Sequence, residues 1–115
     1  MTSADDGTRR RLDGLRRELL AQLAALRADH DAVVDASRGS NADDEHDPEG
    51  ATIAFERAQV DALARSAQQR LEEVDAALRR LDEGTYGTCR VCGRAILPER
   101  LEARPSATTC TTCRA

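Results

Sequence analysis

Two rows of mostly apolar residues, identical in their spacing, restrict the fold of this chain more than any other feature. The first row consists of Leu12, Leu15, Leu19, Leu23, Leu26, His30 and Val33, and the second consists of Val60, Leu63, Ala67, Leu71, Val74, Leu78 and Leu81. In each row the steps are 3, 4, 4, 3, 4 and 3 residues, a mean of 3.5, which is the period of a coiled coil. Two such rows joined by a short polar segment predict an antiparallel pair of long helices, and thus an all-α fold.

Local signals mark where these helices begin and end. Arg38 and Gly39 are typical of a helix C-terminus, and Gly84 marks the end of the second helix. Asp47 and Pro48 indicate a helix start, with aspartate as the N-cap and proline in the first turn. We therefore expect a flexible N-terminal tail at residues 1–7, a coiled-coil hairpin at 8–83 with an acidic tip loop at 40–47, and a zinc finger at 84–115.

The composition agrees with long paired helices better than with a compact core. Only 2% of the 115 residues are aromatic, whereas 33% are charged. A globular core usually takes much of its buried area from aromatic side chains. A narrow seam of alanine and leucine between two helices needs none of them.

The strongest chemical signal is a pair of Cys-x2-Cys motifs. The four cysteines are Cys89, Cys92, Cys110 and Cys113, with 17 residues between the two motifs. Two thiolates on a tight turn can share one tetrahedral ion, and this separation is typical of a four-cysteine zinc site. Four protein ligands leave no position for water or substrate, which predicts one structural Zn²⁺ ion. A redox role, in which oxidation of the thiols releases the zinc, is an alternative.

Acidic residues crowd into the segment between the two helices. Five acids occupy seven positions: Asp43, Asp44, Glu45, Asp47 and Glu49. Like charges at this density repel one another and destabilise a loop, which favours a functional role for the acidic tip. The alternative is that any antiparallel coiled coil has a polar tip of this kind. His46 lies among the acids and either tunes their charge near neutral pH or is a solvated residue.

The C-terminal segment carries a dense motif. It reads Gly84-Thr85-Tyr86-Gly87-x-Cys89-x-x-Cys92-Gly93-x-x-Ile96, continues as Arg100-Leu101-x-Ala103-x-Pro105-x-Ala107 and ends as Cys110-x-x-Cys113. Together with the helical pair before it, this motif closely resembles the TraR/DksA zinc-finger family. The resemblance implies a bacterial transcription regulator that binds RNA polymerase core directly, through the secondary channel, without reading a promoter sequence. It also implies that acids at the tip, here Asp43, Asp44, Asp47 and Glu49, approach the catalytic region of the polymerase.

The tip departs from the family pattern. The family's best-studied tip has two aspartates three residues apart and an alanine two residues further on. Asp44 and Asp47 have the first spacing, but Glu49 stands at the alanine position. If the pattern starts at Asp47 instead, Gly50 and Thr52 replace the second aspartate and the alanine.

A second departure concerns guanosine tetraphosphate. Family members that respond to this alarmone carry basic residues on the helix before the finger. The matching face here has Ser66, Gln69 and Glu73, and only Arg104 retains a basic position. We therefore expect weak binding of the alarmone.

Two other classes of function fit parts of the sequence. One is a structural or adaptor protein that does not act on polymerase, a coiled coil with one end stabilised by zinc. The other is a nucleic-acid-binding zinc ribbon, suggested by Arg90, Arg94, Arg100, Arg104 and Arg114. A net charge of −4 and the scarcity of aromatic stacking residues argue against the ribbon and against sequence-specific DNA binding.

Several activities and locations are not expected from the sequence. We expect no enzymatic activity, because there is no phosphate-binding glycine loop and no metal site with an open position. The chain has no apolar run long enough to span a membrane and no signal-peptide core, which predicts a cytoplasmic protein without membrane contact. Reduced cysteines in that compartment favour zinc over disulfides.

Overall fold

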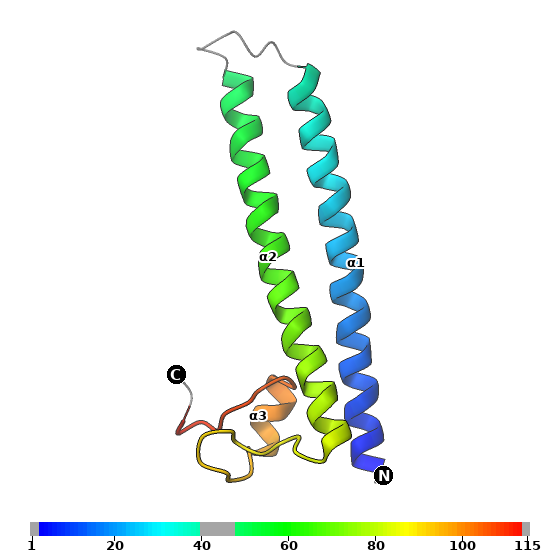
Figure 1. Cartoon of the computed structure of the whole chain (residues 1–115), viewed down its shortest axis with the longest axis vertical. Coiled ribbons are helices and arrows are strands. Elements are labelled where there is room, and N and C mark those ends of the chain that lie inside the picture. Colours follow the sequence, from blue (N-terminus) through cyan, green and yellow to red (C-terminus); the bar gives the residue numbers. More distant parts are fainter. Residues whose placement is uncertain (1–2, 40–47, 114–115) are drawn as a thin grey trace. The chain divides into compact units, whose positions relative to one another are not determined.

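The computed structural model describes residues 3–39 and 48–113, and three helices account for most of them (Figure 1). These are α1 at Ser3–Gly39, α2 at Pro48–Glu83 and the short α3 at Pro98–Ala103. The described residues contain no strand, and Thr88 and Ala95 form an isolated antiparallel bridge. The predicted all-α fold class, with two long helices followed by a small four-cysteine module, is confirmed.

The first helix begins earlier than the sequence predicts. Residues 3–7, which were assigned to the N-terminal tail, lie in the first turns of α1. Asp6 falls in this first part of the helix, where negative charge interacts favourably with the helix dipole. This favourable placement gives a physical reason for the earlier start.

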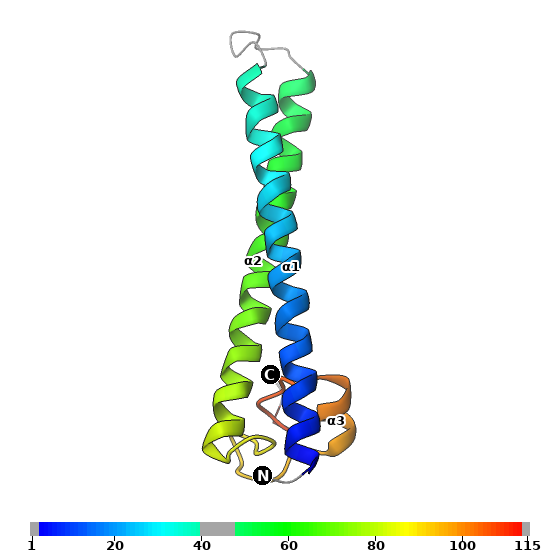
Figure 2. The same ribbon diagram turned by 90° about the vertical axis from the view of Figure 1, so that its right-hand side faces the viewer.

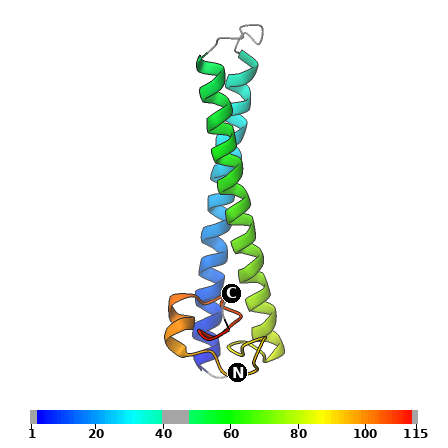
Figure 3. The ribbon, with the colours of Figure 1, turned by 90° about the vertical axis from the view of Figure 1, so that its left-hand side faces the viewer.

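The chain divides into two compact units, which we describe separately. The finger-bearing unit comprises Met1–Glu18 and Arg70–Ala115, and the hairpin unit comprises Leu19–Gln69. Within each unit a segment of α1 runs antiparallel beside a segment of α2, as the two side views show (Figures 2 and 3). The predicted antiparallel pairing of the helices is therefore present in both units.

The core of the hairpin unit follows the predicted rows on α1 but departs from them on α2. Leu19, Leu23 and Leu26 are buried, as expected. Leu63, which the sequence placed in the seam, is 46% exposed, and Ala64 is the more buried residue. The prediction for Leu63 was wrong. Both Ala64 and Leu63, three and four residues before the buried Ala67, are spaced to share its face, and it is Ala64 that the helix turns inward.

The core of the finger-bearing unit joins both long helices to the C-terminal module. Buried apolar residues come from α1, from α2 and from the finger: Leu12, Leu71, Val74, Ala77, Ile96 and Ala107. The ion pairs at its surface link α1 to α2, through Arg16 Nε and Asp75 Oδ1 at 2.8 Å and through Arg9 and Asp82. Arg11 of α1 also donates a hydrogen bond to the backbone oxygen of Glu102 in α3. The finger is thus packed against the helices rather than tethered to them.

Candidate metal centre

The four cysteines predicted as ligands lie together in the finger. Their sulfur atoms all lie within 4.8 Å of one another. The Sγ atoms of Cys92 and Cys110 are 3.8 Å apart, far beyond the length of a disulfide bond, and all four thiols are free. Four sulfurs bound to one zinc at 2.3 Å in tetrahedral geometry are about 3.8 Å apart. The donor set and its spacing therefore fit Zn²⁺.

Two glycines shape the first cysteine turn. Gly87 and Gly93 have φ angles of 81° and 75°, in the left-handed region that favours glycine. Gly93 N–H donates to the carbonyl of Cys89 at 2.9 Å, and Cys89 N–H donates to the carbonyl of Arg94 at 2.8 Å. These bonds close the turn around Cys92 and hold its thiol beside that of Cys89.

The second cysteine turn is tied to the first through the backbone. Cys113 N–H donates to the carbonyl of Cys110 at 3.2 Å, which closes the second turn. Arg90 N–H, from the first turn, donates to the carbonyl of Thr108 at 2.9 Å. This hydrogen bond between the two turns holds the two pairs of thiols close together, so that four ligands from separate parts of the sequence can share one ion.

Backbone donors make this site favourable for thiolates. The N–H groups of Cys92 and Cys110 lower the pKa of the Cys89 thiol to about 6. The N–H of Cys113 likewise lowers the pKa of Cys110. A hydrogen bond to the Cys110 sulfur raises the pKa of Cys113 to about 12, so zinc binding must release the Cys113 proton. Since thiolates are the metal-binding form, the turns prepare two of the four ligands before the ion binds.

Side chains outside the cysteine set hold the finger in shape. Tyr86 Oη donates to the backbone oxygen of Pro105 at 2.7 Å, and Arg100 Nε donates to the backbone oxygen of Thr109 at 2.7 Å. The sequence assigned no role to Tyr86, and it placed Arg100 among the arginines that suggest a nucleic-acid-binding ribbon. The first bond joins a residue before α3, and the second a residue within α3, to the segment that leads into Cys110. No local pattern in the sequence signals either bond.

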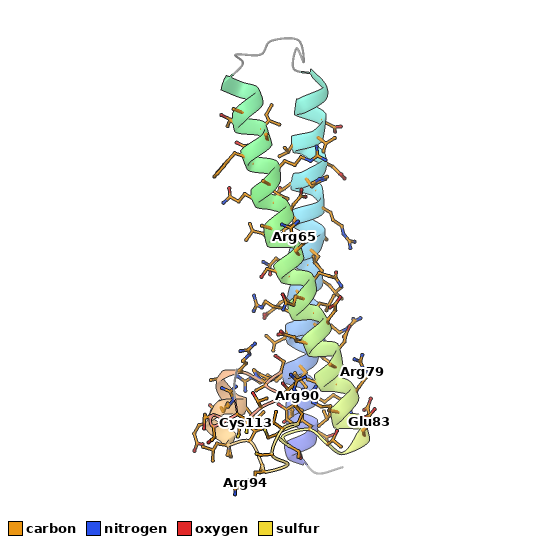
Figure 4. All side chains as sticks on the ribbon, turned by 60° about the vertical axis from the view of Figure 1, so that its left-hand side comes forward. Arg65, Arg79, Glu83, Arg90, Arg94 and Cys113 are labelled. Carbon is orange, nitrogen blue, oxygen red and sulfur yellow. The ribbon has the colours of Figure 1, made fainter. Side chains whose placement is uncertain are left out.

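The finger arginines do not form one uniform basic surface. Arg90 and Arg94 are exposed (Figure 4), whereas Arg100 is committed to the backbone of Thr109. Arg104 Nη2 lies 3.8 Å from Glu73 Oε2, so its charge faces a carboxylate of α2. This pairing weakens the positive potential at Arg104, the one basic position retained from the family members that respond to guanosine tetraphosphate.

The tip residues are only partly covered by the structure. Asp43, Asp44 and Asp47 lie outside the described residues, as does His46. Glu49 lies in the first turn of α2.

Comparison with known proteins places this arrangement in a family. Residues 84–115 match the family described as "Prokaryotic dksA/traR C4-type zinc finger". The structure of transcription factor DksA2 from Pseudomonas aeruginosa is similar, with a TM-score of 0.53 and 30% sequence identity. That similarity covers 86% of this chain and 76% of the DksA2 chain, so it includes the long helices as well as the finger.

Two sequence relatives extend the comparison. The protein YteA of Bacillus subtilis is 41% identical over 66 residues, which is 57% of this chain and 28% of YteA. The RNA polymerase-binding transcription factor DksA of Caulobacter vibrioides is 44% identical over 50 residues, which is 43% of this chain and 35% of that protein. The aligned segments thus span less than half the length of these relatives.

The fold and the site together define a helical-hairpin protein with a C4 zinc finger. The chain belongs to the TraR/DksA zinc-finger family. Its cofactor is one structural zinc ion. Among the described residues, no helix is both long enough and apolar enough to cross a membrane.

Proposed function

We propose that this protein is a bacterial transcription regulator that binds the core of RNA polymerase directly. The similarity to DksA2, which extends over 86% of the chain, carries the proposal. The name of the Caulobacter vibrioides relative supports it, since that protein is an RNA polymerase-binding transcription factor. The same function accounts for the cytoplasmic location predicted from the sequence, because that is the compartment of bacterial RNA polymerase.

In this proposal, Cys89, Cys92, Cys110 and Cys113 are the zinc ligands and the ion is structural. The module has few buried apolar residues of its own, chiefly Ile96 and Ala107. A core of this size does not stabilise a fold by itself, and metal binding then supplies much of the folding free energy. With all four coordination positions held by protein, the zinc has no open position for a reaction, which is consistent with a protein that is not an enzyme.

The acidic tip is the proposed effector of regulation. Asp43, Asp44, Asp47 and Glu49 would enter the secondary channel and place negative charge near the polymerase active site. This mode does not require DNA reading, which suits a chain with a net charge of −4. The pairing of Arg104 with Glu73 supports the expectation of weak guanosine tetraphosphate binding, because the remaining basic group is partly neutralised.

A binding experiment with a competitor tests the proposal. The immobilised protein should retain purified bacterial core RNA polymerase, and an excess of a factor known to occupy the secondary channel should release it. Retention without release would place the contact on another surface of the polymerase. No retention by zinc-loaded protein would contradict the proposal and favour the structural or adaptor alternative.

A further inference from the structure

A cavity in the finger-bearing unit lies where the first turns of α1 meet the finger. It has a volume of about 230 Å³ and is lined by Thr8, Arg11, Tyr86, Pro98, Leu101 and Glu102. The side views show α3 beside this end of α1 (Figures 2 and 3). None of the lining residues is a zinc ligand or belongs to the acidic tip, so the cavity has no part in the site described above.

The lining of the cavity is apolar on one side and polar on the other. The ring of Tyr86, with Pro98 and Leu101, forms the apolar side. The Tyr86 hydroxyl is already bonded to a backbone oxygen, so the ring is what it offers to a ligand. Thr8 and Arg11 of α1 bring a hydroxyl and a guanidinium to the polar side.

The guanidinium of Arg11 has donors to spare. Its Nη2 donates to the backbone oxygen of Glu102, which holds the group at the cavity. A guanidinium carries several N–H donors in a fixed fork and has no acceptor, so one bond leaves most of its capacity unused.

The positive charge at this end of the unit lacks carboxylate partners. Three other arginines of the unit, Arg9, Arg16 and Arg104, form ion pairs with acids. In the part of the chain that the structure describes, no ion pair joins Arg11 or Arg80 to a carboxylate. Arg80 also has a buried Nη2 atom without a hydrogen-bond partner among these residues.

Both of these cations act on the aromatic wall of the cavity. Burial raises the pKa of Tyr86, and the positive charges of Arg11 and then Arg80 oppose that rise. The potential beside the ring is therefore positive. Such a cavity favours a ligand with one negative group and an apolar body.

We propose that this cavity binds a small organic carboxylate, with its charged group on Arg11 and Thr8 and its hydrocarbon chain against Tyr86, Pro98 and Leu101. A carboxylate matches the fork of a guanidinium and forms charge-assisted hydrogen bonds with it. The volume has room for about eight non-hydrogen atoms, at the roughly 30 Å³ that each water molecule takes in the liquid. A ligand of this size binds modestly, with a dissociation constant of about 1 mM.

Titration of the zinc-loaded full chain with hexanoate tests the proposal through tyrosine fluorescence. Tyr86 is the only tyrosine and the chain has no tryptophan, so a change in emission reports on this cavity. Hexanoate should change the emission saturably, whereas hexanamide, which has the same shape but no charge, should bind about 10-fold more weakly or less. Sodium chloride at the same ionic strength should give no saturable change. The absence of a saturable change with hexanoate, or equal binding of the amide, would overturn the proposal.

A pair of matched variants tests the role of Arg11. Arg11→Met should weaken hexanoate binding about 10-fold or more, because it removes the charge and keeps most of the aliphatic stem. Arg10→Met removes the same charge at the exposed neighbouring position and should bind hexanoate as the parent does. Equal affinities of all three proteins would overturn the proposal. The comparison of hexanoate with hexanamide uses the parent protein and therefore stands even if Arg11→Met disturbs the finger.

The carboxylate has two conceivable sources, a free small molecule and an acidic side chain of the polymerase. Hexanoate added to core polymerase retained on the immobilised protein separates them, with hexanamide and sodium chloride as controls. Release by hexanoate alone assigns the carboxylate to the polymerase, and unchanged retention assigns it to a free molecule. Only this last experiment rests on the proposed function, and a failure to retain polymerase at all would count against that function and not against the cavity.

Discussion

The guanidinium of Arg11, in the third turn of α1, donates from Nη2 to the backbone oxygen of Glu102, 91 residues away in α3. The same arginine lies near Tyr86, whose hydroxyl is bonded to Pro105, and its positive charge acts on that hydroxyl. One side chain of α1 therefore binds the short helix of the finger and, through its charge, acts on the segment that leads into the first zinc turn.

This contact predicts a measurable change in the titration of Tyr86. Burial raises the pKa of Tyr86 above 10, and the charge of Arg11 opposes that rise. Arg11→Met keeps most of the aliphatic stem but removes the charge, so it should raise the pKa of Tyr86 further. Tyr86 is the only tyrosine and the chain has no tryptophan, so ultraviolet titration of tyrosinate reports on this residue alone. Arg10→Met, at the exposed neighbouring position, is the control and should leave the titration unchanged.

The same raised pKa sets a pH dependence of stability. Because the folded pKa of Tyr86 lies above its unfolded value, the unfolded chain loses this proton first as the pH rises. The contribution of the protonated Tyr86 is therefore full below pH 10 and declines above it. Tyr86→Phe should remove that decline and cost about 1 kcal/mol at neutral pH through the lost bond to Pro105. Chemical denaturation at neutral pH and above pH 10 would measure both effects, and an equal alkaline loss in both proteins would contradict the assignment.

The zinc site predicts a fixed stoichiometry. Freshly reduced protein should contain one zinc per chain by elemental analysis. Cys92→Ser should lose the metal and unfold the finger, because three thiolates leave the tetrahedral shell open and the module has little core of its own. Thr112→Ala, at an exposed position of the second turn, should retain the metal. If the finger of the metal-free parent protein stayed folded, packing and not zinc would be what stabilises the module.

The observed helix register predicts unequal costs for two leucines of α2. Leu71→Asp introduces a charge at a buried position and should lower the free energy of unfolding by ~2–4 kcal/mol. Leu63→Asp changes a residue that is 46% exposed and should cost less than ~1 kcal/mol. Circular dichroism melts at low protein concentration would compare them. Equal losses of helical stability would return Leu63 to the seam where the sequence analysis placed it.

The tip predicts a separation of binding from regulation. Replacing Asp44 and Asp47 by asparagine should leave polymerase affinity nearly unchanged but weaken the transcriptional effect, because shape is preserved while two negative charges are removed. The same change relieves repulsion among the loop acids and should slightly stabilise the free protein, which a misfolded variant could not show. In vitro transcription at matched occupancy would decide. Regulation equal to that of the parent would mean that the tip charges have no part in it.

The sequence by itself determined the elements of the fold and the chemistry of the metal site. A repeat of 3.5 residues identifies two helices and most of their buried residues, since local spacing alone decides which side chains share a face. The two Cys-x2-Cys turns likewise specify four thiolates for one ion, because turn geometry is local. Gly87 and Gly93 flank the first of these turns in the sequence, and both have positive φ.

The tertiary structure decided what depends on residues distant in the chain. Leu63 and Ala64 lie four and three residues before the buried Ala67, and the repeat fits either of them. The choice of Ala64 over Leu63 therefore came from packing against α1 and not from the repeat. The contact of Arg11 with Glu102 and the pairing of Arg104 with Glu73 join positions whose separation no periodicity encodes. The two apolar rows and the Cys-x2-Cys motifs are short-range patterns, set by the local geometry of helices and turns. The contacts just named arise only when folding brings separate elements together.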